Sequence, residues 1–252
     1  MEINLKENER IDDLEFKGYK IIQNKEGFCF GIDSVLLSDF AKEIRNNSRV
    51  LDLGTGTGIL CILLSGKTNL KQIVGVEVQK EVADMAKRSV KLNSLENKIE
   101  ILNENILNLV NIYEKCSFDA IVTNPPYKKL NTGIQNSNDK KLISRHEITA
   151  DLEDFIETSK NMLKDKGEFY MVHRPERLAD IICLMRKYKI EPKLIKFVSP
   201  VINKEPNLVL IKGIKNAKPF LKFDKILYVY DENGNYTDDI LKIYNKDIIK
   251  EG

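Results

Sequence analysis

The sequence predicts an α/β fold in which seven strands form a doubly wound, mostly parallel sheet covered by helices. Two observations carry this prediction. From residue 49 onward, short apolar runs alternate with longer segments of helical periodicity. The first apolar run also ends in a glycine-rich segment, which is typical of the turn where such sheets bind a ligand.

The individual elements follow from apolar periodicity and from residues that end helices. Gly66 and Gly167 are each expected to end a helix, because glycine adopts the left-handed closing conformation without a side-chain clash. The predicted strands cover residues 49–53, 72–77, 98–102, 118–123, 167–173, 193–199 and 207–213, and the predicted helices cover 58–65, 80–93, 151–164 and 176–188.

Additional elements are expected on both sides of this core. Residues 18–30 alternate like a hairpin, and residues 33–43 have the pattern of an amphipathic helix. Near the end of the chain, turn-forming residues 231–235 suit a hairpin or a strand-turn-helix unit. We therefore expect an N-terminal cap (1–45), a main domain (46–215) and a C-terminal extension packed on that same domain (216–252).

The composition excludes several classes of protein. The longest strongly apolar run, residues 59–64, is far shorter than the roughly 20 residues that cross a bilayer, so we expect a cytoplasmic protein without a membrane partner. The cysteines show neither close pairing nor metal-ligand spacing, which predicts no metal site. No segment indicates an obligate protein partner.

Charge is distributed unevenly along the chain, although the net charge is only +2. Residues 1–16 carry two basic and six acidic groups, whereas residues 160–200 carry ten basic and five acidic groups. Residues 124–145 carry five basic groups and one acidic group. Residues 128–147 lack periodicity, so we expect a long mobile loop there. The basic segments favour a polyanionic partner such as RNA.

The glycine-rich segment, residues 52–58, reads Asp-Leu-Gly-Thr-Gly-Thr-Gly. The dinucleotide fingerprint would need a glycine where Ile59 stands, which disfavours a nicotinamide cofactor. Asp52 would repel a pyrophosphate but suits a cofactor that carries a cationic amino acid. Glu77 ends the next strand, where a carboxylate can accept hydrogen bonds from ribose hydroxyls. These features predict S-adenosylmethionine as the cofactor, held by Asp52, Gly54, Thr55, Gly56, Gly58 and Glu77.

The predicted catalytic residues are Asn124, Pro125, Pro126 and Tyr127, which follow the strand at 118–123. An exocyclic aromatic amine is a poor nucleophile, because its lone pair is delocalised into the ring. The side-chain oxygen of Asn124 and the carbonyl of Pro125 can accept both amine hydrogens and so localise that pair. The prolines restrict the backbone, and Tyr127 offers a ring on which an extruded base can stack.

Together, residues 52–58 and 124–127 resemble the amino-methyltransferases of the S-adenosylmethionine-dependent, class I (Rossmann-like) fold. Residues 27–37, 83–90 and 171–178 narrow the resemblance to the bacterial valine-tRNA adenine-N6-methyltransferase family, which modifies adenine 37 beside the anticodon. The similarity covers residues from about 16 to 240. It implies a tRNA substrate and methylation of the N6 amine of an adenine, namely adenine 37 of a valine tRNA.

The resemblance also implies roles for further residues. Gly31 and Asp33 would border the cofactor, as would Asn124, which also holds the target adenine. Asn105 stands where relatives commonly have an aspartate that contacts the cofactor's adenine, and Glu104 is the alternative for this contact. The RNA-binding candidates are the basic residues that flank the catalytic segment and the His-Arg-Pro-Glu-Arg segment, namely Lys128, Lys129, Arg174 and Arg177.

Other functions remain open from the residues alone. The same acceptors would serve a guanine amine of ribosomal RNA, an adenine amine of DNA or the amide of a release-factor glutamine. Arg174 and Arg177 could instead pair with surface acids, and His173 could be a core histidine. A non-catalytic RNA-binding protein is the alternative from a different class.

Overall fold

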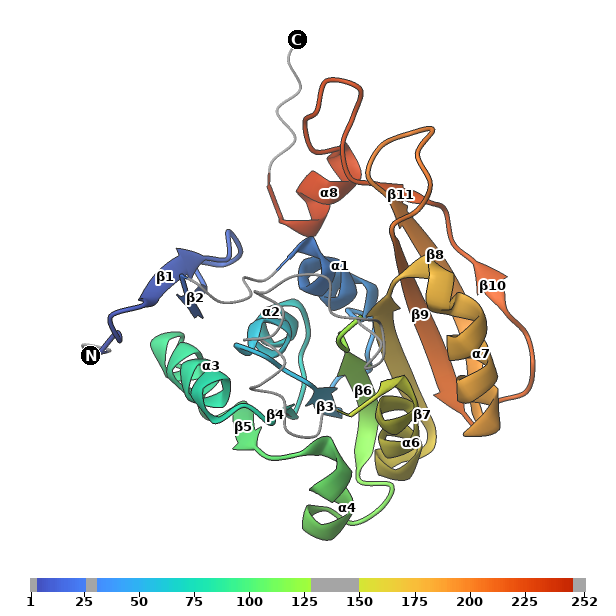
Figure 1. Ribbon diagram of the computed structural model, residues 1–252, viewed down its shortest axis with the longest axis horizontal. Coiled ribbons are helices and arrows are strands. Elements are labelled where there is room, and N and C mark those ends of the chain that lie inside the picture. Colours follow the sequence, from blue (N-terminus) through green and yellow to red (C-terminus); the bar gives the residue numbers. More distant parts are fainter. Residues whose placement is uncertain (1–3, 26–30, 128–149, 247–252) are drawn as a thin grey trace, which may run out of the picture.

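The computed structural model describes residues 4–25, 31–127 and 150–246. Its main feature is a twisted nine-stranded sheet with helices on both faces (Figure 1). The strands are β1 (Glu9–Asp13), β2 (Lys20–Asn24), β3 (Arg49–Leu53), β4 (Gln72–Glu77), β5 (Ile99–Asn103), β6 (Phe118–Thr123), β7 (Leu163–His173), β8 (Ile190–Ser199), β9 (Leu208–Lys215), β10 (Lys222–Phe223) and β11 (Leu227–Tyr228). The helices are α1 (Ile32–Phe40), α2 (Ile59–Lys67), α3 (Lys80–Leu92), η1 (Ile106–Asn108), α4 (Leu109–Ile112), α6 (Leu152–Met162), η2 (Pro175–Arg177), α7 (Leu178–Lys187) and α8 (Asp238–Ile243).

The strand order is β10-β8-β9-β7-β6-β3-β4-β5, and β11 also pairs with β8. The pairings β7-β6, β6-β3, β3-β4 and β4-β5 are parallel, and β9 runs antiparallel to both β7 and β8. All seven predicted strands are therefore present, and the doubly wound, mostly parallel sheet is confirmed. The predicted strand number was too low, because the two-residue strands β10 and β11 are too short to produce a periodic sequence pattern.

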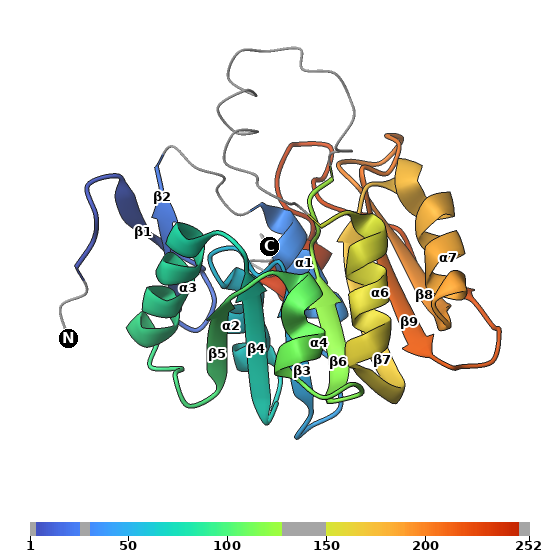
Figure 2. The same cartoon turned by 60° about the horizontal axis from the view of Figure 1, so that its bottom comes forward.

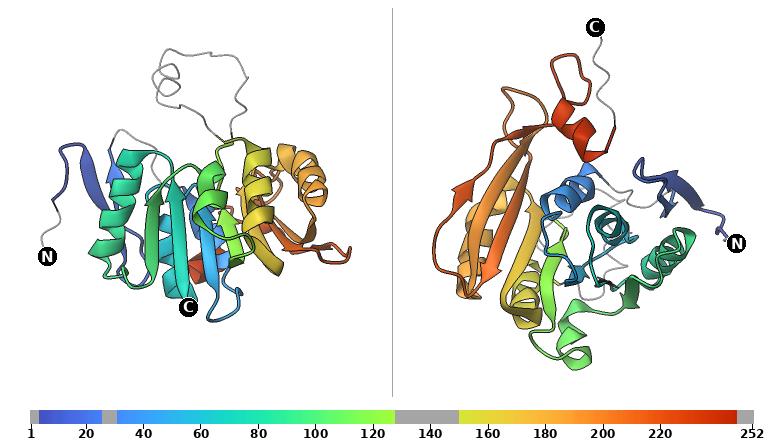
Figure 3. Two further views of the ribbon diagram at one scale, coloured as in Figure 1. Left: turned by 90° about the horizontal axis from the view of Figure 1, so that it is seen from below. Right: turned by 180° about the vertical axis from the view of Figure 1, so that it is seen from behind.

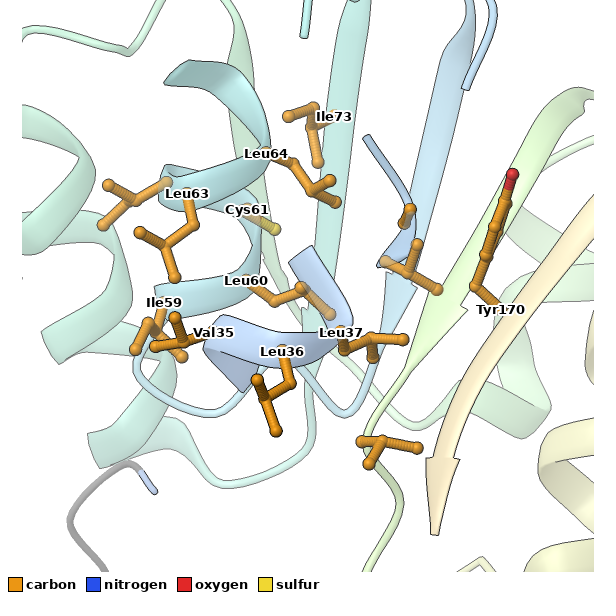
Figure 4. Packing of buried hydrophobic residues seen from close by; sticks show 14 of the residues in the cluster. Val35, Leu36, Leu37, Ile59, Leu60, Cys61, Leu63, Leu64, Ile73 and Tyr170 are labelled. Atoms are coloured by element: carbon orange, nitrogen blue, oxygen red, sulfur yellow. The ribbon is translucent and has the colours of Figure 1, made fainter. Parts of the chain in front are cut away.

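Each face of the sheet is covered by its own hydrophobic core. Because side chains alternate along a strand, Val50 of β3 points into the core under α1, α2 and α3, whereas Leu51 and Leu53 point into the core under α4, α6 and α7. Figure 4 shows the first core, in which Leu37 of α1 and Leu60 of α2 pack above the sheet. Figure 3 shows that these helix layers lie on opposite faces. Nearly continuous burial of β3 explains its apolar sequence.

The N-terminal hairpin differs from the predicted one. The strand β2 pairs antiparallel with β1, so the described hairpin covers residues 9–24, and residues 26–30 of the predicted hairpin lie outside the described residues. Glu9 of β1 is buried and bound by Arg88 of α3 through nitrogen-oxygen distances of 2.6 and 2.7 Å. The acidic strand β1 was missed because its pairing depends on this contact with a distant helix. The predicted cap helix is confirmed as α1, shortened to nine residues.

Neither Gly66 nor Gly167 acts as predicted, because neither belongs to the glycines with positive φ. Gly66 lies inside α2, where a Cβ atom would come within 2.7 Å of the Tyr19 ring. Gly167 lies inside β7, which begins at Leu163, and its Cβ atom would come within 2.9 Å of the Lys164 carbonyl oxygen. Close packing thus explains both glycines.

The C-terminal segment returns to the sheet through β10 and β11 and ends in α8 beside α1 (Figure 1). This matches the strand-turn-helix alternative, because α8 follows the turn at residues 231–235. Within the described ranges, no helix combines the length and apolar character that crossing a membrane requires.

Candidate active site

The candidate residues gather where parallel strands end at one edge of the sheet. From β3 the chain proceeds to β4 on one side, while β6 pairs with the other side of β3. A sheet whose connections diverge in this way leaves a crevice at the carboxyl ends of the two central strands. The glycine-rich turn follows β3 and the catalytic segment follows β6, so both lie at the same edge of the sheet (Figure 2).

The glycine-rich turn requires glycine for its backbone conformation. Gly54, Gly56 and Gly58 have φ values of 71°, 56° and 87°, which residues with a Cβ atom rarely adopt. The turn is anchored to β4, because the amides of Gly54 and Thr55 donate to the Val76 carbonyl at 3.0 and 2.9 Å. Apart from its chain neighbours, no heavy atom of the described residues lies within 4 Å of a Cβ atom built on Gly56. The turn therefore presents bare backbone to open space, as a cofactor cradle requires.

Asp52 supports this turn from behind. Its side chain is only 1% exposed and accepts hydrogen bonds from the Thr55 hydroxyl at 2.6 Å and the Cys61 thiol at 3.4 Å. Burial raises the pKa of the Asp52 carboxyl from 3.8 to about 6, although these two hydrogen bonds oppose the increase. A nearby cationic group would stabilise the ionised form of such a buried carboxyl.

Glu77 joins the end of β4 to the glycine-rich turn. One carboxylate oxygen accepts from the Gly56 amide at 3.1 Å, and the other accepts from the Gln79 amide at 2.9 Å. Glu77 is 6% exposed and lies near Asp52, whose pKa it raises. Two carboxylates beside an open glycine turn fit a ligand that carries hydroxyls and an ammonium group, and they do not fit a phosphate.

The third predicted contact to the cofactor lies after β5. The side chain of Asn105 caps η1, because its oxygen accepts from the Leu107 amide at 3.0 Å. Glu104 accepts from the Asn105 amide at 2.7 Å and from the Asn108 side chain at 2.9 Å. Both candidates therefore already have local partners, and neither is favoured over the other.

The catalytic segment is tied to α1 by hydrogen bonds between residues about 90 positions apart. The Tyr127 hydroxyl lies 2.7 Å from an oxygen of Asp33 and 2.8 Å from the side-chain oxygen of Asn124. Because a hydroxyl has one proton, it donates to one of these acceptors at a time. The Asn124 amide nitrogen lies 3.5 Å from the Ser34 hydroxyl. Gly31 precedes α1 as its N-cap residue, which places it beside Asp33.

The ring of Tyr127 is enclosed by the last residue of β7 and the residue that follows it. The Arg174 guanidinium lies over the ring at 5.1 Å from its centroid, and the His173 ring lies 5.0 Å away, tilted by 55°. Burial and the adjacent carboxylate of Asp33 raise the pKa of Tyr127 well above its ordinary value. An incoming base would therefore meet Arg174 on one face of the tyrosine ring.

His173 fits a buried core histidine. It is 1% exposed, and its Nδ1 atom accepts from the Arg174 amide at 2.8 Å. Burial lowers the pKa of His173 from 6.5 to about 4, so the ring is neutral at pH 7. The acceptor role of Nδ1 assigns the proton to Nε2.

Of the four RNA-binding candidates, the structure describes Arg174 and Arg177. Arg174 donates to the Asn207 carbonyl at 3.0 Å while it covers Tyr127, and Arg177 pairs with Asp180 at 2.7 Å. Lys128 and Lys129 lie outside the described residues, as does the predicted loop at 128–147.

Sequence reasoning missed Ser34, whose proximity to Asn124 depends on how α1 packs. Among the described side chains, no group of three His, Cys, Asp or Glu residues could hold a metal ion.

The fold is that of the class I methyltransferases. The chain belongs to the methyltransferase small domain family, whose model matches residues 31–187. This family assignment confirms the enzyme class and the cofactor expected from the glycine turn.

Curated relatives extend the similarity over most of the chain. It is 26% identical to the tRNA1(Val) (adenine(37)-N6)-methyltransferase of Porphyromonas gingivalis, with 92% of this chain and 93% of the relative covered. It is 25% identical to the protein of the same name from Haemophilus influenzae, with 90% and 94% covered.

Solved structures share the fold at lower identity. A predicted O-methyltransferase from Agrobacterium tumefaciens is 21% identical with a TM-score of 0.68, covering 84% of this chain and 95% of that chain. A geranyl diphosphate C-methyltransferase from Streptomyces coelicolor, solved with S-adenosyl-L-homocysteine, is 14% identical with a TM-score of 0.54, covering 72% and 76%. Because these two names specify different acceptor atoms, the fold alone does not define the substrate.

Proposed function

We propose that this enzyme transfers a methyl group from S-adenosylmethionine to the N6 amine of adenine 37 in a valine tRNA. The observation that carries the proposal is the position of Asn124 to Tyr127, at the end of β6 and beside the glycine-rich turn of β3. The curated relatives that span more than 90% of the chain support tRNA as the substrate. Their names favour adenine N6 over a ribosomal guanine, a DNA adenine or a protein glutamine.

The cofactor supplies an electrophilic methyl group on a sulfonium. In the proposed complex, the exposed backbone at Gly56 lies along the cofactor, and Glu77 accepts hydrogen bonds from its ribose. Gly54, Thr55, Gly58, Gly31 and Asn105 complete this half of the site. Asp52 contributes negative charge behind the turn, which complements a cationic cofactor.

In the proposed mechanism, the target amine donates one hydrogen bond to the Asn124 side-chain oxygen and one to the Pro125 carbonyl, and the proton that it loses on methylation passes to solvent. This arrangement localises the nitrogen lone pair and directs it away from the ring. Pro126 restricts the backbone and so helps to keep both acceptors in place.

Tyr127 and Asp33 prepare Asn124 for this role. In the described structure, the Tyr127 proton can be shared between Asn124 and Asp33. When the amine occupies the Asn124 oxygen, the tyrosine hydroxyl can donate to Asp33 alone. Asp33 is thus a positioning residue, because it keeps the tyrosine in place while it releases the catalytic acceptor.

We also propose that the RNA approaches from the side of Lys128, Lys129, Arg174 and Arg177. Arg174 would have to leave the tyrosine face if the adenine stacks there, and it could then meet a phosphate. A tRNA substrate would place the enzyme in the cytoplasm.

The assignment of residues 1–45, 46–215 and 216–252 to a cap, a main domain and an extension also stays a prediction.

The test is methyl transfer to a defined RNA. Purified enzyme and labelled S-adenosylmethionine are incubated with an unmodified valine tRNA transcript, and nucleosides are identified by mass spectrometry. We expect N6-methyladenosine in this transcript and none in a matched transcript whose adenine 37 is replaced by guanine. Label in ribosomal RNA or in a release factor, with none in any tRNA, would overturn the proposed substrate.

A further inference from the structure

The edge of the sheet formed by β10 carries exposed phenylalanines among lysines. The side chains of Phe220 and Phe223 are 65% and 66% exposed, the two highest values among the large hydrophobic side chains that the structure describes as exposed. Lys218, Lys222 and Lys225 lie between and beside them and are exposed as well. We refer to these five residues as the edge surface.

The backbone beneath the edge surface is held firmly. The strand β10 pairs with β8 through Lys222 and Phe223, and the Asp224 amide donates to the Ile195 carbonyl at 2.8 Å. Leu221 packs against the core on the α7 side. Phe223 therefore projects from a paired strand, and Phe220 lies in the segment that leads into this strand; both rings are left exposed.

The charge of the edge surface is positive. Its acidic neighbour Asp224 pairs with Lys196 at 3.1 Å. Burial raises the pKa of this carboxyl, but the hydrogen bond from Lys196 and the nearby lysine charges lower it more, so the pKa lies below its usual value. None of the ion pairs within the described ranges involves Lys218, Lys222 or Lys225. Lys222 lies 5.8 Å from the ring centroid of Phe220. A second copy of this chain would bring like charges together, whereas an RNA strand offers phosphates for the lysines and bases for the rings.

The edge surface lies within reach of an RNA bound at the crevice. Four strand spacings separate β10 from β6, which leads into the catalytic segment, and this amounts to about 19 Å at the usual spacing of neighbouring strands. This distance corresponds to a few nucleotides. In Figure 1, β10 lies at the outer edge of the sheet beside β8, and β8, β9 and β7 stand between it and β6.

We infer that the edge surface binds unpaired bases and phosphates of the same RNA that presents the target amine. This inference rests on the proposed function, because it concerns the rest of that substrate. Phe220 and Phe223 supply rings for base stacking, and the three lysines contact phosphates. The surface thus contributes to selecting a folded RNA over a short oligonucleotide.

The experiment measures binding and methylation of a full-length valine tRNA transcript by Phe220→Ala/Phe223→Ala. We expect Kd and KM to increase roughly tenfold, since base stacking on an aromatic ring contributes substantially to such binding. The kcat value and the affinity for S-adenosylmethionine should remain unchanged, which also shows that the variant is folded. A Lys218→Ala/Lys222→Ala/Lys225→Ala variant should reduce the slope of log affinity against log salt by about two.

The matched control replaces exposed apolar residues in α4, away from β10. Val110 and Ile112 are 41% and 46% exposed, and Val110→Ala/Ile112→Ala should leave Kd and KM unchanged. If both edge-surface variants match the wild type in KM and salt slope while wild type methylates the tRNA, the inference is wrong and the proposed function survives. A wild-type enzyme that methylates no tRNA would overturn both.

Discussion

The two sides of the crevice are built differently. On the cofactor side, the turn at residues 52–58 comes from one continuous segment, and its supports Asp52 and Glu77 end adjacent strands. On the substrate side, Tyr127 is held by Asp33 from α1 and covered by Arg174 from the end of β7. One side is therefore a local motif, and the other is assembled from three separate segments.

This difference indicates which contacts can change during the reaction. Backbone amides bind the glycine turn to the Val76 carbonyl, and these hydrogen bonds are kept while the sheet is folded. The substrate side depends on side-chain contacts that compete with each other, such as the two acceptors of the Tyr127 hydroxyl. We therefore expect substitutions on the substrate side to affect turnover, and those on the cofactor side to affect stability and cofactor affinity.

The largest expected effect separates the two sides directly. Asn124→Ala should lower kcat by roughly a hundredfold to a thousandfold, because one of two acceptors for the developing charge is lost. The affinity for S-adenosylmethionine, measured by calorimetry, should change less than about threefold. A large loss of cofactor affinity would instead assign Asn124 mainly to the cofactor. Asn216→Ala, on an exposed turn, is the control.

The second prediction concerns the pH dependence of stability on the cofactor side. The pKa of Asp52 is about 6 when folded and near 3.8 when unfolded, so the folded state binds more protons between these values. Stability of the wild type is therefore lost through this group as pH rises from about 4 to about 6. Asp52→Asn should remove this loss, which amounts to on the order of 3 kcal/mol.

Urea unfolding of both proteins at about pH 4 and about pH 7 measures the difference. The free energy of unfolding of Asp52→Asn minus that of the wild type should be larger at the higher pH. Equal differences at both pH values would mean that Asp52 is not enclosed as described. The exposed Glu232→Gln serves as the control.

A smaller effect is expected from the hydrogen bond between Asp33 and Tyr127. Asp33→Asn should lower kcat by about tenfold, because with a weaker acceptor at position 33 the tyrosine hydroxyl donates to the Asn124 oxygen for more of the time. Tyr127→Phe removes this hydroxyl but keeps the ring, so the Asp33→Asn/Tyr127→Phe variant should be no slower than Tyr127→Phe alone. Additive losses in single-turnover rates would show that Asp33 acts independently of Tyr127.

The smallest effect should follow Arg177→Ala. Arg177 already pairs with the exposed Asp180 three residues away, and such pairs contribute little to stability. We expect KM for tRNA to rise less than about threefold, whereas Arg174→Ala should raise it more. Equal and large increases would indicate that Arg177 leaves Asp180 and contacts the RNA.

The sequence alone determined the parts of the molecule that depend on neighbouring residues. Alternating apolar segments predicted the seven main strands, and the positions of residues 52–58, Glu77 and 124–127 predicted the cofactor and the chemistry. Backbone conformation and strand alternation act over a few residues, so they leave a readable pattern. The family comparison confirmed the enzyme class that these motifs implied.

Only the tertiary structure decided which distant residues meet. Pairing of the acidic strand β1 depends on Arg88 of α3. The two-residue strand β10 forms by hydrogen bonding to the edge of β8. The contacts of Tyr127 with Asp33 and Arg174, and the burial of Asp52, likewise arise from packing of separate segments. No local pattern encodes such contacts, because each needs an element far along the chain to be in place.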